Sequence, residues 1–291
     1  MTILLAGAMG QVGREITERA TNFGLDVVGF DAQDMDITDL EAIRRQAEAC
    51  QPRVIINAAA YTAVDKAESE RDLAFAINRD GASNLARVAA ERNIPLLHIS
   101  TDYVFDGDKD GDYIESDMPN PVSVYGESKY AGELAVAGHC EQSVVLRVSW
   151  VFGQYGHNFV KTMLRLGAER DELNVVNDQY GAPTPATSIA DTLLGMAEKI
   201  VKRPDELTID DWGLFHLPSD PGVTWYEFAV EIFEQAHAAG VLEKKPKVNP
   251  VGSEAYPTPV KRPKNSKLAG IRIYEASNWQ AELRTMLKSK I

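Results

Sequence analysis

Tyr125 and Lys129 are the residues of this sequence whose types and spacing most directly predict chemistry. A separation of four places both side chains on one face of a helix. A tyrosine near its ordinary pKa of about 10 is a poor acid or base at neutral pH. A lysine ammonium beside it favours the phenolate and lowers the tyrosine pKa toward the working range. The pair therefore predicts a proton-transfer site, with a buried core tyrosine as the structural alternative.

Three glycines, Gly7, Gly10 and Gly13, divide the segment that directly follows the first apolar run, residues 2–6. At such a place a chain has to turn tightly, bring backbone N–H groups up to a pyrophosphate and pack a helix closely on a strand. Glycine meets each demand because it has no Cβ atom. Glycines also mark ordinary turns, but the order of strand, glycine loop and helix predicts dinucleotide binding.

Acidic and small residues follow the next two expected strands. Asp31 stands 18 positions after Gly13, about where a carboxylate binds the ribose diol of an adenosine. An aspartate there repels a 2′-phosphate and favours NADH. Asp34 and Asp36 are neighbours, and any of the three can be a loop or cap residue, so the sequence leaves NADH and NADPH open. Residues 57–60, Asn-Ala-Ala-Ala, are small enough for a cofactor to lie across them or for a helix to pack closely.

Polar side chains also stand after the fourth and fifth expected strands. Residues 95–100 run into Thr101 and Asp102, which puts a hydroxyl and a carboxyl at a strand's carboxyl end, where open α/β sheets bind ligands. Asp102 has turn capping as its alternative. Trp150 follows residues 143–148, and an indole just past a buried strand is usually a core residue.

The elements that have to position these residues alternate along the first half of the chain. Continuous apolar runs are separated by helical segments of about 11 to 22 residues, which is typical of a parallel sheet with helices on both faces. We therefore predict an α/β fold, a Rossmann-type doubly wound parallel sheet, with Asp36 or Thr38 capping the second helix. The strands are expected at 2–6, 25–30, 53–57, 95–100 and 143–148.

After residue 150 the pattern is less regular and predicts a smaller α/β C-terminal substrate lobe. We divide the chain into a cofactor-binding domain, residues 1–156, and a mainly substrate-binding lobe, residues 157–291, some segments of which return to the first domain. Helices are expected at 157–170, 187–202, 224–239 and 276–289, and strands at 173–176 and 213–217.

The composition narrows the class of protein. The 291 residues carry 43 acidic and 30 basic side chains, a net charge of -13, which disfavours a nucleic-acid partner because phosphate neutralisation supplies most of that affinity. There are two cysteines and no Cys/His cluster with zinc spacing. No apolar run approaches the roughly 18 residues of a membrane span. We expect a cytoplasmic protein with no metal and no membrane partner.

One segment departs from this acidic average. Between residues 244 and 267, Glu254 is the one acidic side chain among seven lysines and arginines. A solvated loop is the common fate of such a run. The alternative is a local anion site, for which Arg262 is the candidate because a planar guanidinium suits phosphate.

The glycine loop, the Thr101 hydroxyl and the Tyr125/Lys129 pair together resemble the extended short-chain dehydrogenase/reductase family. Within it the chain is most similar to the dTDP-4-dehydrorhamnose reductases, and the similarity extends over residues 3–266. The blocks that carry it are NAAAYTAVDKAE at 57–68, STDYVF at 100–105, SWVF at 149–152, NDQYGAPT at 177–184 and RPKNS at 262–266.

The resemblance implies that NADPH or NADH reduces the C4 ketone of dTDP-4-dehydro-β-L-rhamnose, with Tyr125 as proton donor. Lys129 would also bind the nicotinamide ribose, and Thr101 would be the third catalytic residue. Family members are commonly homodimers, so a homodimer is expected. Contacts with the dTDP-sugar are expected from Thr101, Asp102, Tyr125, Trp150, Asn158 and Arg262. Cofactor contacts are expected from Gly7, Gly10, Gln11, Val12, Gly13, Asp31, Asp36, Ile37, Ala58, Ala59, Ala60 and Lys129.

Three alternatives stay open beside this reading. A sugar-nucleotide 4,6-dehydratase would resemble Thr-Asp-Glu where this chain has Thr101-Asp102-Tyr103, so the acid for eliminating water is missing. An epimerase, which returns the hydride to the same sugar, is not excluded, although the blocks favour the reductase. A non-catalytic regulatory subunit similar to the methionine adenosyltransferase β subunit can retain the Tyr/Lys pair, so the motifs discriminate poorly against it.

Overall fold

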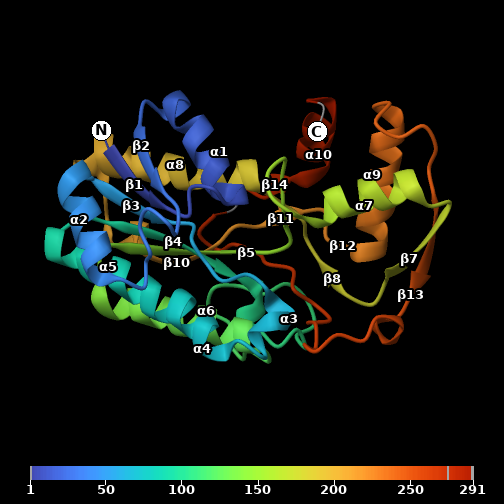
Figure 1. Ribbon diagram of the computed structural model, residues 1–291, viewed down its shortest axis with the longest axis horizontal. Coiled ribbons are helices and arrows are strands. Elements are labelled where there is room, and N and C mark those ends of the chain that lie inside the picture. The colour runs from blue at the N-terminus through green and yellow to red at the C-terminus, as the bar shows by residue number, and fades with distance from the viewer. Residues whose placement is uncertain (1, 274, 290–291) are drawn as a thin grey trace.

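One parallel sheet of six strands forms the centre of the molecule in the computed structural model, which describes residues 2–273 and 275–289 (Figure 1). Its strands are β1 Thr2–Ala6, β2 Asp26–Phe30, β3 Val54–Asn57, β4 Leu96–Thr101, β5 Ser143–Val148 and β10 Gly213–His216. They lie in the order β10-β5-β4-β3-β1-β2, and every neighbouring pair is parallel. The order reverses between β1 and β3, as in a doubly wound sheet. The predicted fold class is confirmed.

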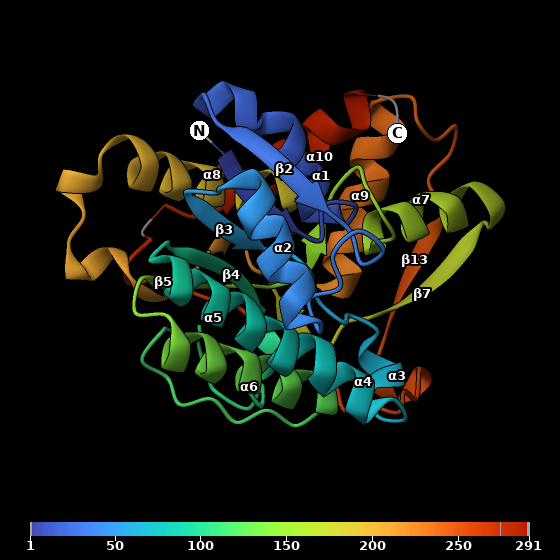
Figure 2. The same ribbon diagram turned by 60° about the vertical axis from the view of Figure 1, so that its left-hand side comes forward.

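Helices cover both faces of this sheet (Figures 1 and 2). Along β1, Ile3 and Leu5 face one layer and Leu4 and Ala6 the other, because successive side chains of a strand point to opposite faces. Burial on both faces explains why the strands read as continuous apolar runs. The first layer contains α1 Gln11–Arg19 and α8 Ala186–Lys202, and the second contains α2 Leu40–Cys50, α5 Ala82–Arg92 and α6 Val124–His139.

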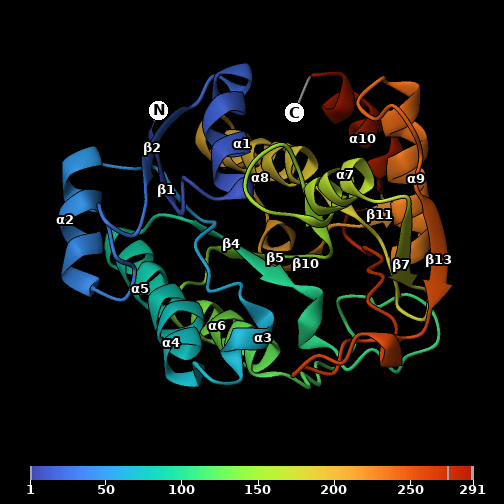
Figure 3. The same cartoon turned by 45° about the vertical axis from the view of Figure 1, so that its right-hand side comes forward.

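A second hydrophobic core lies beside the sheet, among α7 Phe159–Glu169, α9 Trp225–Ala238 and α10 Trp279–Lys288 (Figure 3). It also contains side chains of the parallel pair β7 Glu172–Val176 and β13 Lys247–Val251. The periodicity predicts the helices and β7 but not β13, because a strand with Lys247 and Pro250 has no apolar run. Short pairs complete the lobe: β6 Val151–Phe152 with β9 Thr184–Pro185, β8 Tyr180–Gly181 with β12 Val223–Thr224, and β11 Ser219–Asp220 with β14 Ser277–Asn278.

Two elements of the second half belong to the large sheet: α8 packs on its face and β10 pairs with β5. The division of the chain at residue 156 stays a prediction. In the part of the chain that the structure describes, no helix is both long enough and apolar enough to cross a membrane. The remaining helices are short: α3 Val64–Ala67, α4 Arg71–Phe75, a π-helical turn at Ala76–Gly81, and 3-10 turns at Ala20–Phe23, Asp102–Val104, Pro204–Glu206, Ile209–Asp211 and Ser253–Ala255.

Candidate active site

A cleft of about 580 Å³ opens at the carboxyl edge of the sheet. Its walls come from the segments that follow β1, β3, β4 and β5 and from the first turns of α6, so residues far apart in the sequence meet there. Open α/β sheets bind their ligands at this edge. Most of the residues predicted from the sequence line the cleft: Gly10, Gln11, Val12, Ala58, Ala59, Ala60, Thr101, Asp102, Tyr125, Lys129 and Trp150.

Gly7 and Gly13 allow the glycine loop to fold closely on the sheet. Gly7 has a φ of +81°, and a Cβ atom there would lie 2.6 Å from the backbone nitrogen of Ala59. A Cβ atom at Gly13 would lie 2.1 Å from the carbonyl oxygen of Gly7. A side chain at either position would therefore displace the N-terminus of α1, whose free N–H groups and dipole suit a phosphate.

The acidic residues Asp31 and Asp36, which follow β2, accept hydrogen bonds from nearby residues of the same loop. Asp31 Oδ1 accepts hydrogen bonds of 2.8 and 3.2 Å from the N–H groups two and three residues on, and Asp36 Oδ1 accepts the N–H and hydroxyl of Thr38. The predicted cap of the second helix is wrong. Asp39 is the N-cap of α2, because its carboxylate directly precedes the helix and reaches the N–H groups of the first turn. The predicted cofactor residues outside the lining of the cleft are Gly7, Gly13, Asp31, Asp36 and the buried Ile37.

The helix α6 begins one residue before Tyr125 and is capped twice. Ser123 Oγ accepts a hydrogen bond of 3.1 Å from the third N–H group of the helix, and the Glu68 carboxylate accepts one of 2.9 Å from the first. These side chains satisfy N–H groups that every helix start leaves free. They fix the turn from which Tyr125 and Lys129 enter the cleft.

Burial dominates the ionisation of this pair. It raises the pKa of Tyr125, and the hydroxyl of Thr101 offsets only part of the effect. The sequence-based expectation of a lowered tyrosine pKa is therefore wrong in direction. Burial also lowers the pKa of Lys129 to about 8, against the charge of Glu133. At neutral pH Tyr125 is protonated, as a proton donor has to be.

Thr101 and Asp102 form a polar corner beside the tyrosine. The Thr101 hydroxyl donates to Asp102 Oδ1 at 3.0 Å and accepts the N–H of Tyr103 at 3.2 Å. Burial raises the pKa of Asp102 to about 7, although the hydroxyls of Thr101 and Ser266 lower it. Asp102 Oδ2 is buried and has no hydrogen-bond partner among the described residues.

Trp150 has a backbone conformation that few tryptophans adopt, with a φ of +44°. Such a conformation costs about 1–3 kcal/mol and persists only where the surroundings hold it. Its indole stacks on Trp225 with ring centroids 3.6 Å apart and 8° between the planes. Its Nε1 donates a hydrogen bond of 2.9 Å to Ser266 Oγ. Two distant segments therefore fix this wall of the cleft.

A second cavity of about 580 Å³ adjoins the cleft, and Trp225 lines both. Its walls are largely apolar and include Phe159 and Met163 of α7. Arg262 also lines this second cavity. Arg262 does not line the catalytic cleft. Its guanidinium donates to the Tyr103 hydroxyl at 3.0 Å and to the Asp65 carboxylate.

Six of the seven basic residues of the run at residues 244–267 fall into two groups, and the seventh, Lys267, forms ion pairs with Asp112 and Asp220. Lys261 and Lys264 line the second cavity with Arg262. The lysines at the other end of the run form exposed ion pairs with acidic residues of the surface, as expected of a solvated segment: Lys244 with Asp171, Lys245 with Glu234 and Lys247 with Glu172.

Asn158 lies outside the lining of both cavities. Its Oδ1 caps α7 by accepting an N–H at 3.1 Å, and its Nδ2 donates to Gln11 Oε1 at 3.0 Å and to the carbonyl of Gly153 at 2.7 Å. The amide is thus occupied by protein partners. It links α7 to the glycine loop, and its predicted contact with the substrate stays a prediction.

Known proteins identify the family of this chain. The family model described as RmlD substrate binding domain matches residues 1–291. A dTDP-4-dehydrorhamnose reductase of Aggregatibacter actinomycetemcomitans is 44% identical over 290 residues, which cover 98% of this chain and 97% of that protein. The chain belongs to the dTDP-4-dehydrorhamnose reductase family. The resemblance seen in the sequence is confirmed.

Solved structures of the dTDP-4-dehydrorhamnose reductase family share the fold. The enzyme of Clostridium acetobutylicum matches with a TM-score of 0.90 at 37% identity, covering 99% of both chains. The enzyme of Bacillus anthracis, solved in complex with NADP, matches with a TM-score of 0.90 at 35% identity, also covering 99% of both chains. As a member of this family, the protein is an oxidoreductase.

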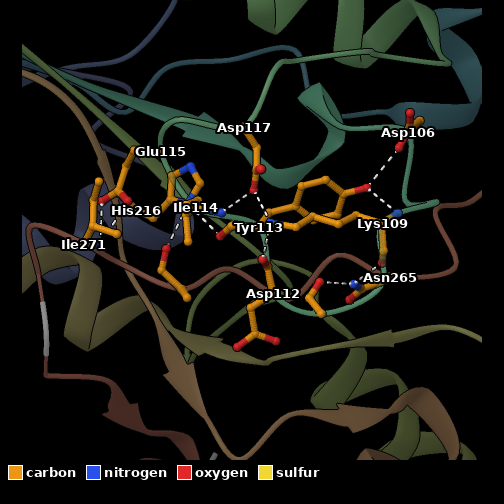
Figure 4. Close-up of polar contacts among 12 residues, drawn as sticks. Asp106, Lys109, Asp112, Tyr113, Ile114, Glu115, Asp117, His216, Asn265 and Ile271 are labelled. Carbon is orange, nitrogen blue, oxygen red and sulfur yellow. Dashed lines mark hydrogen bonds and ion pairs between the residues drawn. The ribbon is translucent and has the colours of Figure 1, made fainter.

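In this member of the reductase family, the loop at residues 106–117 holds the C-terminal segment 262–271 in place (Figure 4). Asn265 Nδ2 donates to two carbonyl oxygens of the loop, at 3.0 and 2.7 Å. The Glu115 carboxylate accepts the N–H of Ile271 at 3.0 Å. These contacts anchor the segment that places Arg262 at the second cavity and Ser266 beside Trp150.

Several residues of the site are not identified by the sequence reasoning. Trp225 is the most important of them, and the only local signal is its place at the start of an expected helix. Ser266 lies within a family block but has no predicted role. The other lining residues without a prediction are Thr62, Val64, Ile99, Ser100, Tyr103, Val148, Val151 and His157.

Proposed function

We propose that the protein reduces the C4 ketone of dTDP-4-dehydro-β-L-rhamnose to dTDP-L-rhamnose, with NADPH or NADH as hydride donor. The observation that carries this proposal is the meeting of a protonated Tyr125 with Lys129 and Thr101 in one cleft beside the glycine loop. Reduction of a ketone requires a hydride, one proton and a polar contact for the developing alkoxide. Residues of the cleft can supply the proton and the contact.

The glycine-loop side of the cleft fits a dinucleotide. The backbone of Ala59 occupies the space that a side chain at Gly7 would need. The small residues 58–60 line the cleft together with Gln11 and Val12 at the N-terminus of α1. Gln11 and Val12 would hold the pyrophosphate at this N-terminus, and Lys129 would bind the nicotinamide ribose. When bound, the nicotinamide supplies the hydride.

Tyr125 is the proton donor of this proposal. Burial keeps its phenol protonated at neutral pH. As charge develops on the oxygen at C4, the phenolic proton moves to that oxygen and the tyrosine becomes a phenolate. The Thr101 hydroxyl, which donates to Asp102 in this structure, would turn its proton toward the phenolate as it forms, and a hydrogen bond to Thr101 lowers the pKa of Tyr125. Burial would thus keep the tyrosine protonated before the reaction, and Thr101 would stabilise the phenolate after the proton has left.

The two cavities correspond to the two ends of a nucleotide sugar. The sugar ring would lie in the catalytic cleft, which Asp102 and Trp150 line. The apolar part of the second cavity would take the base. Arg262 would bind the pyrophosphate between them, because its planar guanidinium donates two parallel hydrogen bonds to phosphate oxygens.

The decisive assay combines purified protein, dTDP-4-dehydrorhamnose and either NADPH or NADH. We expect the absorbance of the reduced cofactor to fall in step with the formation of dTDP-L-rhamnose, measured by chromatography. A nucleotide sugar without a ketone is the control and should leave the cofactor unchanged. No consumption of either cofactor would refute the proposal, and interconversion of sugars without net cofactor consumption would favour an epimerase.

A further inference from the structure

A chain of buried polar groups connects the cofactor side of the cleft with Lys129. The N–H of Ala59 donates to Asn57 Oδ1 at 3.0 Å, and Asn57 Nδ2 lies 2.9 Å from His98 Nδ1. His98 Nε2 lies 3.5 Å from Lys129 Nζ. Asn57, His98 and Lys129 are each at most 2% exposed, so their polar atoms depend on one another for partners.

The N–H of Ala59 sets the direction of the whole chain. Because this group can only donate, it requires the carbonyl oxygen of Asn57 to face it, and the amide NH₂ then faces His98 and donates to Nδ1. Nδ1 therefore has no proton. Burial and the nearby Lys129 hold the pKa of His98 well below its ordinary value, so the ring is neutral and carries its one proton on Nε2.

This proton faces the amine of Lys129. A lysine ammonium has three donors and no acceptor, so two donors would meet in the protein interior. A neutral amine has a lone pair, and it can accept the Nε2 proton while it donates to the carbonyl oxygen of Ile99 at 2.7 Å. Reversing the Asn57 amide does not remove the conflict, because its NH₂ group would then face the N–H of Ala59.

We propose that Asn57 and His98 are positioning residues that present a hydrogen-bond donor to the amine of Lys129 and so favour its neutral form over the ammonium. They thereby shift the balance between the two protonation states in which Lys129 can enter the reaction. The inference rests on the proposed function only for the part that Lys129 plays in turnover, since the hydrogen-bond directions follow from the protein alone.

The charged groups around the amine agree with this assignment. Glu133, one turn further along α6, favours the ammonium, but its carboxylate is itself paired with the Arg147 guanidinium at 2.8 and 2.6 Å. Tyr125 is protonated and uncharged at neutral pH. Burial outweighs Glu133 and brings the pKa of Lys129 to about 8, so the ammonium predominates at neutral pH and the neutral amine above pH 8.

The tautomer of His98 is the direct test. Nitrogen-15 NMR of histidine-labelled protein, with the His98 signals identified by their loss in His98→Gln, should place the proton on Nε2 above the pKa of Lys129. In Asn57→Asp a carboxylate would accept from both Ala59 and the imidazole, so the proton should move to Nδ1. Asn93→Asp, which makes the same change of charge at an exposed residue, should leave the tautomer unaltered. A proton on Nδ1 in the native protein would overturn the proposal.

The pKa of Lys129, measured by titration, tests whether Asn57 and His98 favour the neutral amine. Carbon-13 NMR of lysine-labelled protein follows the amine, with the Lys129 signal identified in Lys129→Arg. Asn57→Ala frees the imidazole to turn its acceptor toward an ammonium, so the pKa of Lys129 should rise by roughly half to one pH unit, the size of one hydrogen bond. His98→Gln keeps an amide donor near the Nε2 position and should change this pKa little.

An unchanged lysine titration in Asn57→Ala would also overturn the proposal. None of these measurements uses substrate or cofactor. A protein that fails the turnover assay can therefore still pass them, and the two failures are distinguishable.

Discussion

The sheet side of the cleft and its lobe side hold their residues by different means. On the sheet side, Thr101 ends a strand and Tyr125 and Lys129 stand in the first turns of a capped helix. On the lobe side, Trp150 has a φ of +44° and depends on Ser266 and the stacked Trp225. Regular structure positions the groups that we propose to move protons, and irregular segments position the wall that we propose to contact the ligand. Catalytic rate and substrate affinity should therefore respond to different substitutions.

Substitution of Tyr125 by Phe gives the largest expected effect and tests the sheet side. Loss of a general acid lowers turnover by roughly 10²- to 10⁴-fold. Cofactor binding, measured by fluorescence titration, should stay close to that of the native protein because the ring and the helix remain. Tyr130→Phe, on the same helix but outside the lining of the cleft, is the matched control. Native turnover in Tyr125→Phe would remove the tyrosine from the mechanism.

Asp102, which follows Thr101 at the end of β4, gives the next largest expected effect. The substitution Asp102→Asn should change how the stability of the protein depends on pH. The folded pKa of Asp102 is about 7, above its ordinary 3.8, so the folded protein binds this proton more tightly than the unfolded chain. Stability from this group is complete below pH ~4 and is lost as pH rises through ~7. Asparagine should therefore raise the free energy of unfolding by up to about 4 kcal/mol at pH 8, and by less than half of that at pH 5.

Chemical denaturation of the native protein and of Asp102→Asn at both pH values measures this difference. An equal change at pH 5 and pH 8 would show that the carboxyl does not titrate as inferred. In that case Asp102 would stabilise the fold through hydrogen bonds alone.

Trp225→Leu gives the smallest expected effect and tests the lobe side. Losing the stack on Trp150 removes about 0.5–1.5 kcal/mol of aromatic interaction. The KM for the nucleotide sugar should rise roughly three- to tenfold with little change in kcat, because the contact is the same in the ground state and the transition state. Trp212→Leu, a tryptophan that lines neither cavity, is the control. A fall in kcat equal to that of Tyr125→Phe would contradict the division of the site.

The sequence predicts the sheet side well for physical reasons. Buried parallel strands leave continuous apolar runs, and a tight turn against a phosphate demands glycine at Gly7 and Gly13. The spacing of Tyr125 and Lys129 follows from helix geometry alone. Each of these signals is contained within a few neighbouring residues.

The lobe side could not be predicted in this way. The hydrogen bond from Trp150 to Ser266 spans 116 residues, and no local pattern encodes such a pairing. The strand β13 was missed because it has no apolar alternation, and the cap of α2 at Asp39 because three nearby aspartates satisfy the same rule. The direction of the Tyr125 pKa depends on burial, which only the assembled structure gives.

The position of Trp225 between the two cavities also bears on how tightly a two-part ligand can bind. Because one indole borders both cavities, a molecule that fills the catalytic cleft and a molecule that fills its neighbour bind next to each other without overlap. Joining the two by a covalent bond turns the second binding step into an intramolecular one, which raises its effective concentration to about the millimolar range for a short, flexible connection. Separate sugar and nucleotide fragments should therefore bind weakly and independently, and their joined form should bind far more tightly than either.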